Sequence, residues 1–200
     1  MIWISLALAF TAALIEGRWS LAFVATATFV LTLLPMVLIH WAGIRMPVSF
    51  TVGIVLFIYA TIFLGEAFDF YNRYWWWDIA LHGGSALGFG MLGFLFIFML
   101  FEGDRYAAPA WALALIACTV AVTIGVLWEI FEFLMDSYAG TNMQKSGLPD
   151  TMGDLIVDLA GGAFGGLVGY FYLLDRDLGG LSGGIRQFIA DNARLFRRRR

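Results

Sequence analysis

The amino-acid sequence predicts an all-α fold, a polytopic bundle of about six transmembrane helices. Of its 200 residues, 61% are hydrophobic and 14% are charged, and the mean hydropathy is +0.82. Soluble domains carry about a quarter charged residues, so this chain is too apolar to be one. Several apolar runs are also long enough to cross the ~30 Å hydrocarbon layer of a bilayer as helices. The net charge of −3 gives no basis for binding nucleic acid.

Five apolar runs are long enough to span, and one shorter run precedes them. We expect the spans at 21–42, 48–65, 79–101, 108–130 and 153–174. Residues 1–15 are short for a crossing, and they lack the basic segment of a signal peptide because no Lys or Arg precedes Arg18; we interpret them as a short first helix. Together these runs form a predicted bundle domain, residues 1–175. The one cysteine, Cys118, lies inside a span, where we expect a small packing residue.

Residues 176–200 form a predicted basic tail that sets the orientation of the bundle. Seven of the 12 Lys and Arg residues follow the last span, namely Arg176, Arg186, Arg194 and the run Arg197–Arg200. Such residues concentrate on the cytoplasmic side, so the tail predicts a multi-pass protein of the bacterial inner membrane with its C-terminus in the cytoplasm. The tail is either an amphipathic helix on the anionic inner leaflet or a solvated segment. The helical spacing that favours the first interpretation joins Ile185, Phe188, Ile189, Leu195 and Phe196.

Acidic residues gather on one side of the predicted bundle. The linkers 66–78 and 131–152 are separated by two spans, so they emerge on the same membrane face, which is the outer face in this orientation. With the adjoining helix ends they hold nine of the 15 acidic residues: Glu66, Asp69, Asp78, Glu129, Glu132, Asp136, Asp150, Asp154 and Asp158. Arg73, Lys145 and His82 join them. Because so many like charges cannot all stay ionised without a counter-charge, we expect protons or a bound cation there.

Helical spacing turns these acids toward one another. Asp78 and His82 are four residues apart, as are Asp154 and Asp158, and Glu129, Glu132 and Asp136 follow at intervals of three and four. Charged stripes that faced lipid would be costly, so the three stripes predict a pocket between the last three spans, near the outer interface. The last span also carries small residues at four-residue intervals, which let helices approach closely: Gly161, Gly165 and Gly169, with Gly162 and Gly166 in a second row.

Carboxylates with one imidazole are suitable ligands for a divalent metal cation. Mg²⁺, Ca²⁺ and Mn²⁺ accept oxygen-rich shells, and Zn²⁺ accepts His with Asp or Glu, so the identity of the metal is left open. The candidate ligands are His82, Glu129, Glu132, Asp154 and Asp158. Asp78, Asp136, Gln144 and Asp150 are expected beside them or at the mouth of the pocket. Asp78 and Asp150 also stand where N-caps of helices are expected.

Three stretches together resemble the YjdF-like family of bacterial inner-membrane proteins and, more distantly, VanZ. They are "YWWWDIALHGGSALGFG", "LWEIFEF" and "QKSGLPDTMGDLIVDLAGGAFGG", which lie within 50–175. The similarity to VanZ would align Asp78, His82, a helix glutamate, Gln144, Asp154, Gly161 and Gly162 with that family's pattern. It departs from the pattern at Asp158, where Asn is usual, and at Lys145, where Arg is usual. The resemblance implies an envelope setting and no particular reaction.

Three functions fit these residues. The first is a metal-dependent enzyme that acts on a membrane lipid or a lipid-linked envelope precursor, with Glu129, Glu132 and Lys145 as candidate catalytic residues. The second is a structural or partner-binding protein whose acids form a partly protonated latch between helices. The third is a proton- or cation-coupled carrier. This interpretation is less favoured, because a transport path needs polar groups across the whole membrane, and the only polar side chains inside the cytoplasmic half of the spans are hydroxyls. The residues do not decide whether the chain turns anything over, nor its oligomeric state.

Overall fold

The computed structural model describes residues 1–105, 107–176 and 178–196. All regular secondary structure within these ranges is helical, which confirms the predicted all-α class. The contacts divide the chain into two compact units, Met1–Trp77 and the described residues that follow from Asp78. Each unit is described by itself.

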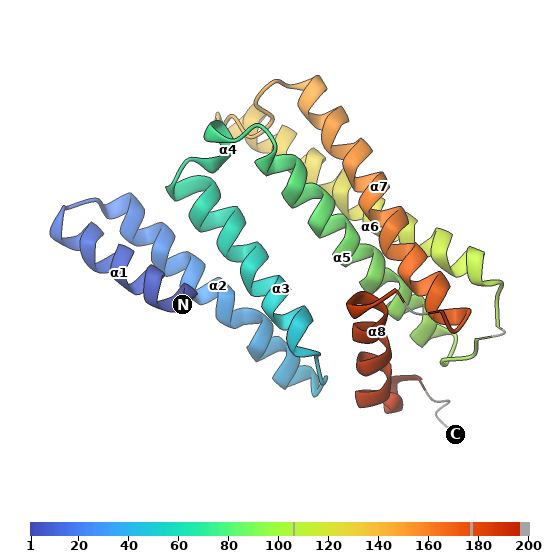
Figure 1. Cartoon of the computed structure of the whole chain (residues 1–200). Helices are drawn as coiled ribbons and strands as arrows, with labels where there is room; N and C mark the ends of the chain where they lie inside the picture. The colour runs from blue at the N-terminus through green and yellow to red at the C-terminus, as the bar shows by residue number, and fades with distance from the viewer. Residues whose placement is uncertain (106, 177, 197–200) are drawn as a thin grey trace. The chain divides into compact units, whose positions relative to one another are not determined.

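The first unit holds four helices, drawn in blue to teal in Figure 1. They are α1 (Ile2–Ile15), α2 (Trp19–Ala42), α3 (Val48–Ile58), which continues as the π-helix η1 (Tyr59–Ala67), and the single turn α4 (Phe70–Arg73). The short turn between α1 and α2 folds them side by side. Leu6, Ala25 and Phe63 form the buried contact between α1, α2 and η1. A hydrogen bond from Trp3 Nε1 to the buried hydroxyl of Thr32, 3.2 Å long, adds a polar link between α1 and α2.

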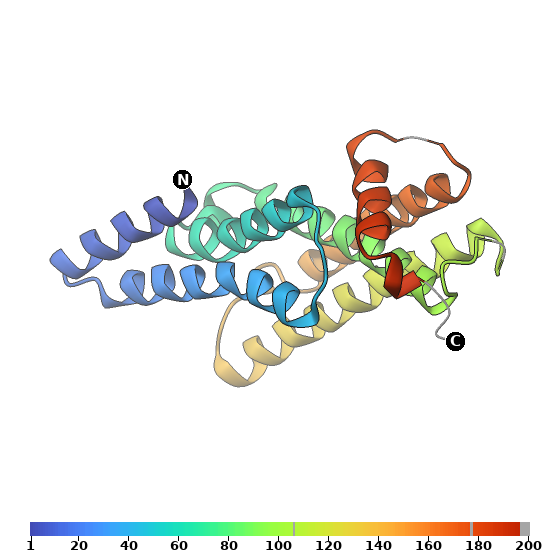
Figure 2. The same cartoon turned by 90° about the horizontal axis from the view of Figure 1, so that it is seen from below.

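The second unit is built from α5 (Trp77–Leu100), α6 (Ala110–Leu134) and α7 (Leu148–Leu173). The π-helix η2 (Met135–Ala139) extends α6, and α8 (Gly180–Asp191) and η3 (Ala193–Phe196) follow α7. The three long helices lie beside one another (Figures 1 and 2). Leu92, Leu127 and Leu159, one from each of them, stay exposed. Such apolar outer faces suit a lipid environment.

Among the described residues, five helices are long and apolar enough to cross a membrane, as the sequence predicts. They are Trp19–Ala42, Val48–Ala67, Trp77–Leu100, Ala110–Ala139 and Leu148–Leu173. The helix α1, with 14 residues, extends about 21 Å at ~1.5 Å per residue, which is short of the hydrocarbon thickness. It is a shorter apolar helix than the five above.

Two helix ends differ from the sequence prediction by more than two residues. The predicted span 108–130 ends at residue 130, whereas the helix continues to Ala139; the last span is predicted from 153, whereas α7 begins at Leu148. A prediction from hydropathy ends a span where charged residues begin. Glu129, Glu132 and Asp154 are buried, however, and the helices that carry them continue past them. The predicted linker 131–152 is thereby shortened to 140–147.

Glycines let the three helices of the second unit approach closely. A Cβ atom at Gly161 would lie 2.6 Å from the carbonyl oxygen of Gly83 on α5, and one at Gly162 would lie 2.9 Å from Cβ of Ala121 on α6. The two glycine rows of α7 therefore face different helices, one α5 and the other α6. Only residues without a side chain permit this spacing, so the predicted close approach is confirmed.

The end of the bundle opposite the acids is closed by side-chain contacts. The guanidinium of Arg105 pairs with the carboxylate of Asp175 at 2.9 Å and donates to the carbonyl oxygens of Tyr172 and Leu173, both at 2.7 Å. These carbonyls belong to the last turn of α7, whose acceptors have no partner within the helix. Arg105 thus ties the loop after α5 to the C-terminus of α7.

The described part of the tail folds against the second unit. Figures 1 and 2 show α8 beside the ends of α5 and α7. Ile185 and Phe188 on α8 are buried, and the ring of Phe196 lies 5.7 Å from that of Phe98 on α5. The apolar stripe expected in this tail is therefore covered by the protein's own helices. Binding to the inner leaflet stays a prediction, and the run Arg197–Arg200 lies outside the described residues.

Candidate metal centre

His82 lies at the centre of the acidic cluster, on the second turn of α5. Its Nε2 atom is 3.9 Å from Oδ1 of Asp78, one turn earlier on α5, and 3.9 Å from Oε1 of Glu129 on α6. Its Nδ1 atom is 3.3 Å from Oδ1 of Asp158 on α7. The ring is buried. One imidazole thus joins all three long helices, and the structure brings the three predicted stripes together.

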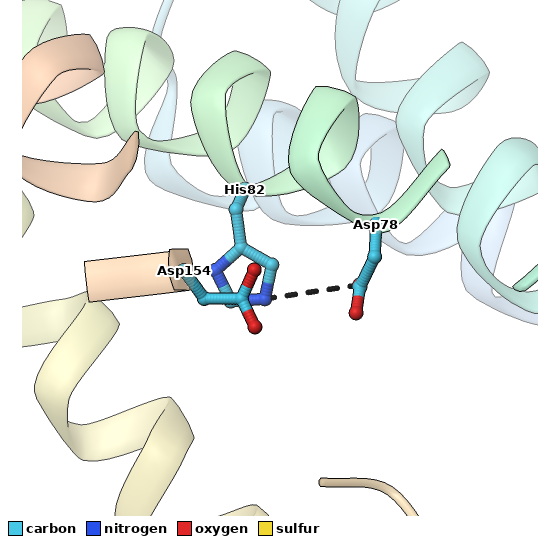
Figure 3. A group of neighbouring side chains, drawn as sticks. All are labelled: Asp78, His82 and Asp154. Carbon is cyan, nitrogen blue, oxygen red and sulfur yellow. Dashed lines mark ion pairs between the residues drawn. The ribbon is translucent and has the colours of Figure 1, made fainter. Parts of the chain in front are cut away.

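Asp154 completes the group around the imidazole. In the view of Figure 3 its carboxylate overlaps the His82 ring, and a dashed line joins the ring to Asp78. One ligand atom from each of Asp78, His82 and Asp154 lies within 4.8 Å of the others. Donor atoms bound to one Zn²⁺ at ~2.0–2.1 Å are at most about 4 Å apart, so movements of under about 1 Å would close this group around an ion.

The two nitrogens of His82 have different surroundings. Nδ1 contacts both oxygens of Asp158, at 3.3 and 3.4 Å. An ionised carboxylate only accepts hydrogen bonds, so this contact is a hydrogen bond in the tautomer that carries its proton on Nδ1. Nε2 is the nitrogen that faces Asp78 and Glu129. In the neutral imidazole, Nε2 then has its lone pair directed at the remaining carboxylates.

Glu129 and Asp154 hold buried carboxylate oxygens without hydrogen bonds. Glu129 is 4% exposed and Asp154 is 3% exposed. Among the described residues, neither oxygen of Glu129 nor Oδ2 of Asp154 has a hydrogen-bond partner. The Thr151 hydroxyl interacts with Glu129 but does not meet hydrogen-bond geometry. Removing a carboxylate from water without a partner costs several kcal/mol, so both groups require a proton or a cation.

Glu132 is buried in the same cluster but is already engaged. Its Oε1 accepts a hydrogen bond of 2.9 Å from Nε1 of Trp128, one turn earlier on α6. Trp128 was not among the residues singled out from the sequence, although its spacing of four from Glu132 is a usable signal. The bond holds Glu132 toward its own helix.

Asp136 does not face the acidic cluster; its carboxylate holds the loop between α6 and α7. The Asp136 carboxylate accepts hydrogen bonds from the Thr141 hydroxyl at 2.7 Å and from the backbone N–H groups of Met143 and Gln144 at 2.7 and 2.9 Å. Its position in the π-helix η2 breaks the spacing that would align it with Glu132. Asp136 therefore departs from the inward-facing stripe that its sequence position predicts.

The same loop carries Gln144, Lys145 and Asp150. The Gln144 side chain donates to the Thr151 hydroxyl at 2.7 Å, which links the loop to the first turns of α7. Lys145 interacts electrostatically with Asp150 and supplies a positive charge at this edge of the cluster. The other residues that the sequence assigns to this membrane face, Glu66, Asp69 and Arg73, belong to the first unit, where their side chains are exposed.

Gly125 is a site residue that the sequence analysis missed. A Cβ atom at this position on α6 would lie 2.8 Å from Cγ of Asp158, and closer still to its Oδ2. The absence of a side chain at Gly125 makes room for the Asp158 carboxylate. Its spacing of four before Glu129 places Gly125 on the acidic face of α6, which is the signal that would have found it.

Comparison with known proteins agrees with this architecture and names no activity. An uncharacterized protein of Thermotoga maritima is 35% identical over 98 residues, which are 49% of this chain and 50% of that protein. The match thus spans about half of that relative's length. No solved structure matches. The YjdF-like name and the distant relation to VanZ stay predictions. The model of the family described as "Predicted membrane protein (DUF2238)" matches residues 1–175, and the chain therefore belongs to this family.

Proposed function

We propose that this protein binds a divalent metal cation between α5, α6 and α7 and acts as a metal-dependent membrane enzyme on a lipid or lipid-linked envelope precursor. One observation carries the proposal: in the cluster around His82 lie buried carboxylate oxygens of Glu129 and Asp154 that have no hydrogen-bond partner in the described part of the chain. Buried charges of this kind are paired or coordinate metals. A dication would neutralise two of the acids at once.

The chemistry of the ligand atoms favours some divalent metals over others. Nε2 of His82 with the carboxylates of Asp78, Asp154 and Glu129 provides one imidazole and three hard oxygen ligands. Mg²⁺ prefers oxygen ligands and retains several waters, whereas Mn²⁺ and Zn²⁺ bind imidazole readily. We therefore favour Mn²⁺ or Zn²⁺ for this site.

The chemistry that such an ion would supply is Lewis-acid catalysis. A bound cation polarises an ester or phosphoryl oxygen, or activates a water molecule as a nucleophile. Glu129 is the candidate for accepting a proton from that water, since it is buried within the cluster. Lys145, beside Asp150 in the adjoining loop, is the candidate for contacting an anionic head group. Under the positive-inside orientation, this loop faces the outside of an inner membrane.

A partly protonated latch is the second candidate, and a specific observation favours it. His82 lies within 3.9 Å of three carboxylates on three different helices, so an imidazolium ion could hold them together without any metal. Buried polar networks of this kind can serve helix packing alone.

Metal analysis of protein purified in detergent without added metal tests the proposal. We expect about one equivalent of a divalent metal in the parent, as measured by mass spectrometry of the elements. Glu129→Gln and Asp154→Asn should lower the affinity for this metal at least about tenfold, because each removes a charged ligand. Glu66→Gln, which changes an exposed acid of the first unit, should leave the metal content unchanged.

The alternative predicts a different result. A parent without stoichiometric metal, whose thermal unfolding temperature falls on His82→Gln substitution, would contradict metal binding and support the latch. Turnover is tested by incubating metal-loaded protein with a bacterial lipid extract and following head-group changes by mass spectrometry, with Glu129→Gln as the inactive control. A metal-loaded parent that changes no lipid would contradict the enzymatic part.

A further inference from the structure

The geometry points to Asp158 as the positioning residue of the metal centre rather than one of its ligands. We infer that Asp158 holds the Nδ1–H group of His82 so that Nε2 is presented to the cation. The inference rests on the proposed metal binding and adds to it a division of roles among the buried acids. It replaces the expectation that Asp158 itself binds the metal.

The first step concerns the carboxylate of Asp158. Both of its oxygens contact the same nitrogen, Nδ1 of His82, at 3.3 and 3.4 Å. Asp158 is 2% exposed, so its carboxylate is shielded from solvent. The two nitrogens of an imidazole lie on different edges of the ring, and an acceptor centred on Nδ1 is therefore directed away from a metal at Nε2. Ligand histidines commonly donate their second N–H to a carboxylate in this way.

The second step concerns the space behind Asp158. A Cβ atom at Gly125 on α6 would be 2.8 Å from Cγ of Asp158. The Asp158 carboxylate therefore rests against the backbone of α6 on one side and against the His82 ring on the other. Confined between the two, it has little freedom to rotate toward the Nε2 side of the ring.

The third step concerns the acids on the other edge of the ring. Nε2 lies 3.9 Å from Oδ1 of Asp78 and 3.9 Å from Oε1 of Glu129, and Asp154 supplies a further ligand atom within 4.8 Å of those of His82 and Asp78. The oxygens that have no hydrogen bond among the described residues belong to Glu129 and Asp154, and Asp158 has none of them. Of these oxygens, Oε1 of Glu129 lies on the Nε2 side of the ring, so that side offers carboxylate oxygen that could bind a cation.

Two substitutions of Asp158 distinguish positioning from ligation. Asp158→Asn keeps an oxygen that accepts from Nδ1–H, and Asp158→Ala removes the acceptor. We expect the affinity for Zn²⁺, measured by competition with a chromophoric chelator, to fall less than about tenfold in the first variant and about 10- to 100-fold in the second. The absorption spectrum of bound Co²⁺ should keep its band positions in Asp158→Asn, because no ligand is exchanged.

A nuclear magnetic resonance measurement tests the same inference without weakening the site. The chain has two histidines, so His40→Gln leaves His82 as the only imidazole to be observed. With ¹⁵N-labelled histidine and bound ¹¹³Cd²⁺, the metal–nitrogen coupling should appear at Nε2, with Nδ1 protonated. Coupling at Nδ1 would overturn the inference.

The remaining outcomes distinguish a failure of the positioning role of Asp158 from a failure of the proposed metal binding. A parent that binds neither Zn²⁺ nor Co²⁺ would overturn the metal site and the role of Asp158 with it. A parent that binds metal, with equal losses and shifted Co²⁺ bands in both Asp158 variants, would overturn the positioning role alone. Asp158→Asn serves as the folded comparison if Asp158→Ala does not yield monodisperse protein.

Discussion

At the scale of single residues, the candidate centre depends on a glycine, Gly125, whose lack of a side chain makes room for a neighbouring carboxylate. Gly125 leaves space on α6 into which the carboxylate of Asp158 fits, and Asp158 in turn contacts His82. A chain of three residues thus connects the backbone of α6 to the ring of α5. The position of the imidazole therefore depends on its contact with Asp158 and on the space that Gly125 leaves.

The substitution Gly125→Ala tests this connection. The added methyl group would overlap the Asp158 carboxylate and displace it from Nδ1 of His82. We expect the affinity for Zn²⁺ to fall about tenfold, as for loss of a supporting hydrogen bond, and thermal unfolding to occur at lower temperature.

Gly84→Ala is the matched control for this substitution. Gly84 also lies in a long helix of the second unit, but a Cβ atom there has no neighbouring atom within 4 Å. Its replacement should leave the metal affinity unchanged. Equal affinities of the parent and the Gly125→Ala variant would contradict the role of Gly125.

At the scale of elements, α7 combines two functions. Its first turns carry Asp154 and Asp158, and its middle carries the glycine rows that face α5 and α6. The close approach brings His82, Glu129 and Asp158 within reach of one another, although they come from three helices. Packing and site formation are therefore coupled along this helix.

Gly165→Ala tests the coupling at the level of the helix. A Cβ atom at Gly165 would lie 2.9 Å from Cα of Gly90, so the methyl group must push α5 and α7 apart. We expect the free energy of unfolding in detergent to fall by about 1–3 kcal/mol, the usual cost of overpacking.

Gly153→Ala provides the comparison on the same helix. Gly153 is half-buried but its Cβ position has no neighbouring atom within 4 Å, so the better helix propensity of Ala should leave stability unchanged or raise it by up to about 1 kcal/mol. A Gly165→Ala variant as stable as Gly153→Ala would contradict the close packing of α5 on α7.

At the scale of the whole molecule, the orientation in the membrane decides which compartment the acidic cluster faces. The acidic cluster lies where α5 begins, α6 ends and α7 begins, and α8 lies at the opposite end of these helices. The concentration of Arg and Lys after the last span predicts that α8 is cytoplasmic and that the loop between α6 and α7 is external.

Cysteine labelling in intact cells tests this orientation. In a Cys118→Ala background, Asn142→Cys introduces a thiol into the exposed loop between η2 and α7, and Gln187→Cys introduces one on the exposed face of α8. A membrane-impermeant maleimide should label the first variant in spheroplasts and the second only after permeabilisation. The background without cysteine should stay unlabelled. The reverse pattern would place the acidic cluster at the cytoplasmic face.

Much of this architecture could be predicted from the sequence. Hydropathy identifies five helices that can span, because burial in lipid requires long apolar runs whatever they pack against. Counting spans between the linkers assigns Asp78, Glu129 and Asp154 to one membrane face. The spacing of Asp154 and Asp158 turns both toward the neighbouring helices, because helical periodicity is a local property of the chain.

Only the tertiary structure assigned different surroundings to acids that look equivalent in the sequence. Asp158 contacts Nδ1 of His82, Glu132 accepts from Trp128, and Asp136 organises a loop, whereas Glu129 and Asp154 keep oxygens without hydrogen bonds among the described residues. The helix that contains α6 also ends later than predicted, and α7 begins earlier, because buried acids do not end a helix as exposed ones do. These differences arise from contacts between helices far apart in the chain, and no local pattern of residue types encodes which side chains meet there.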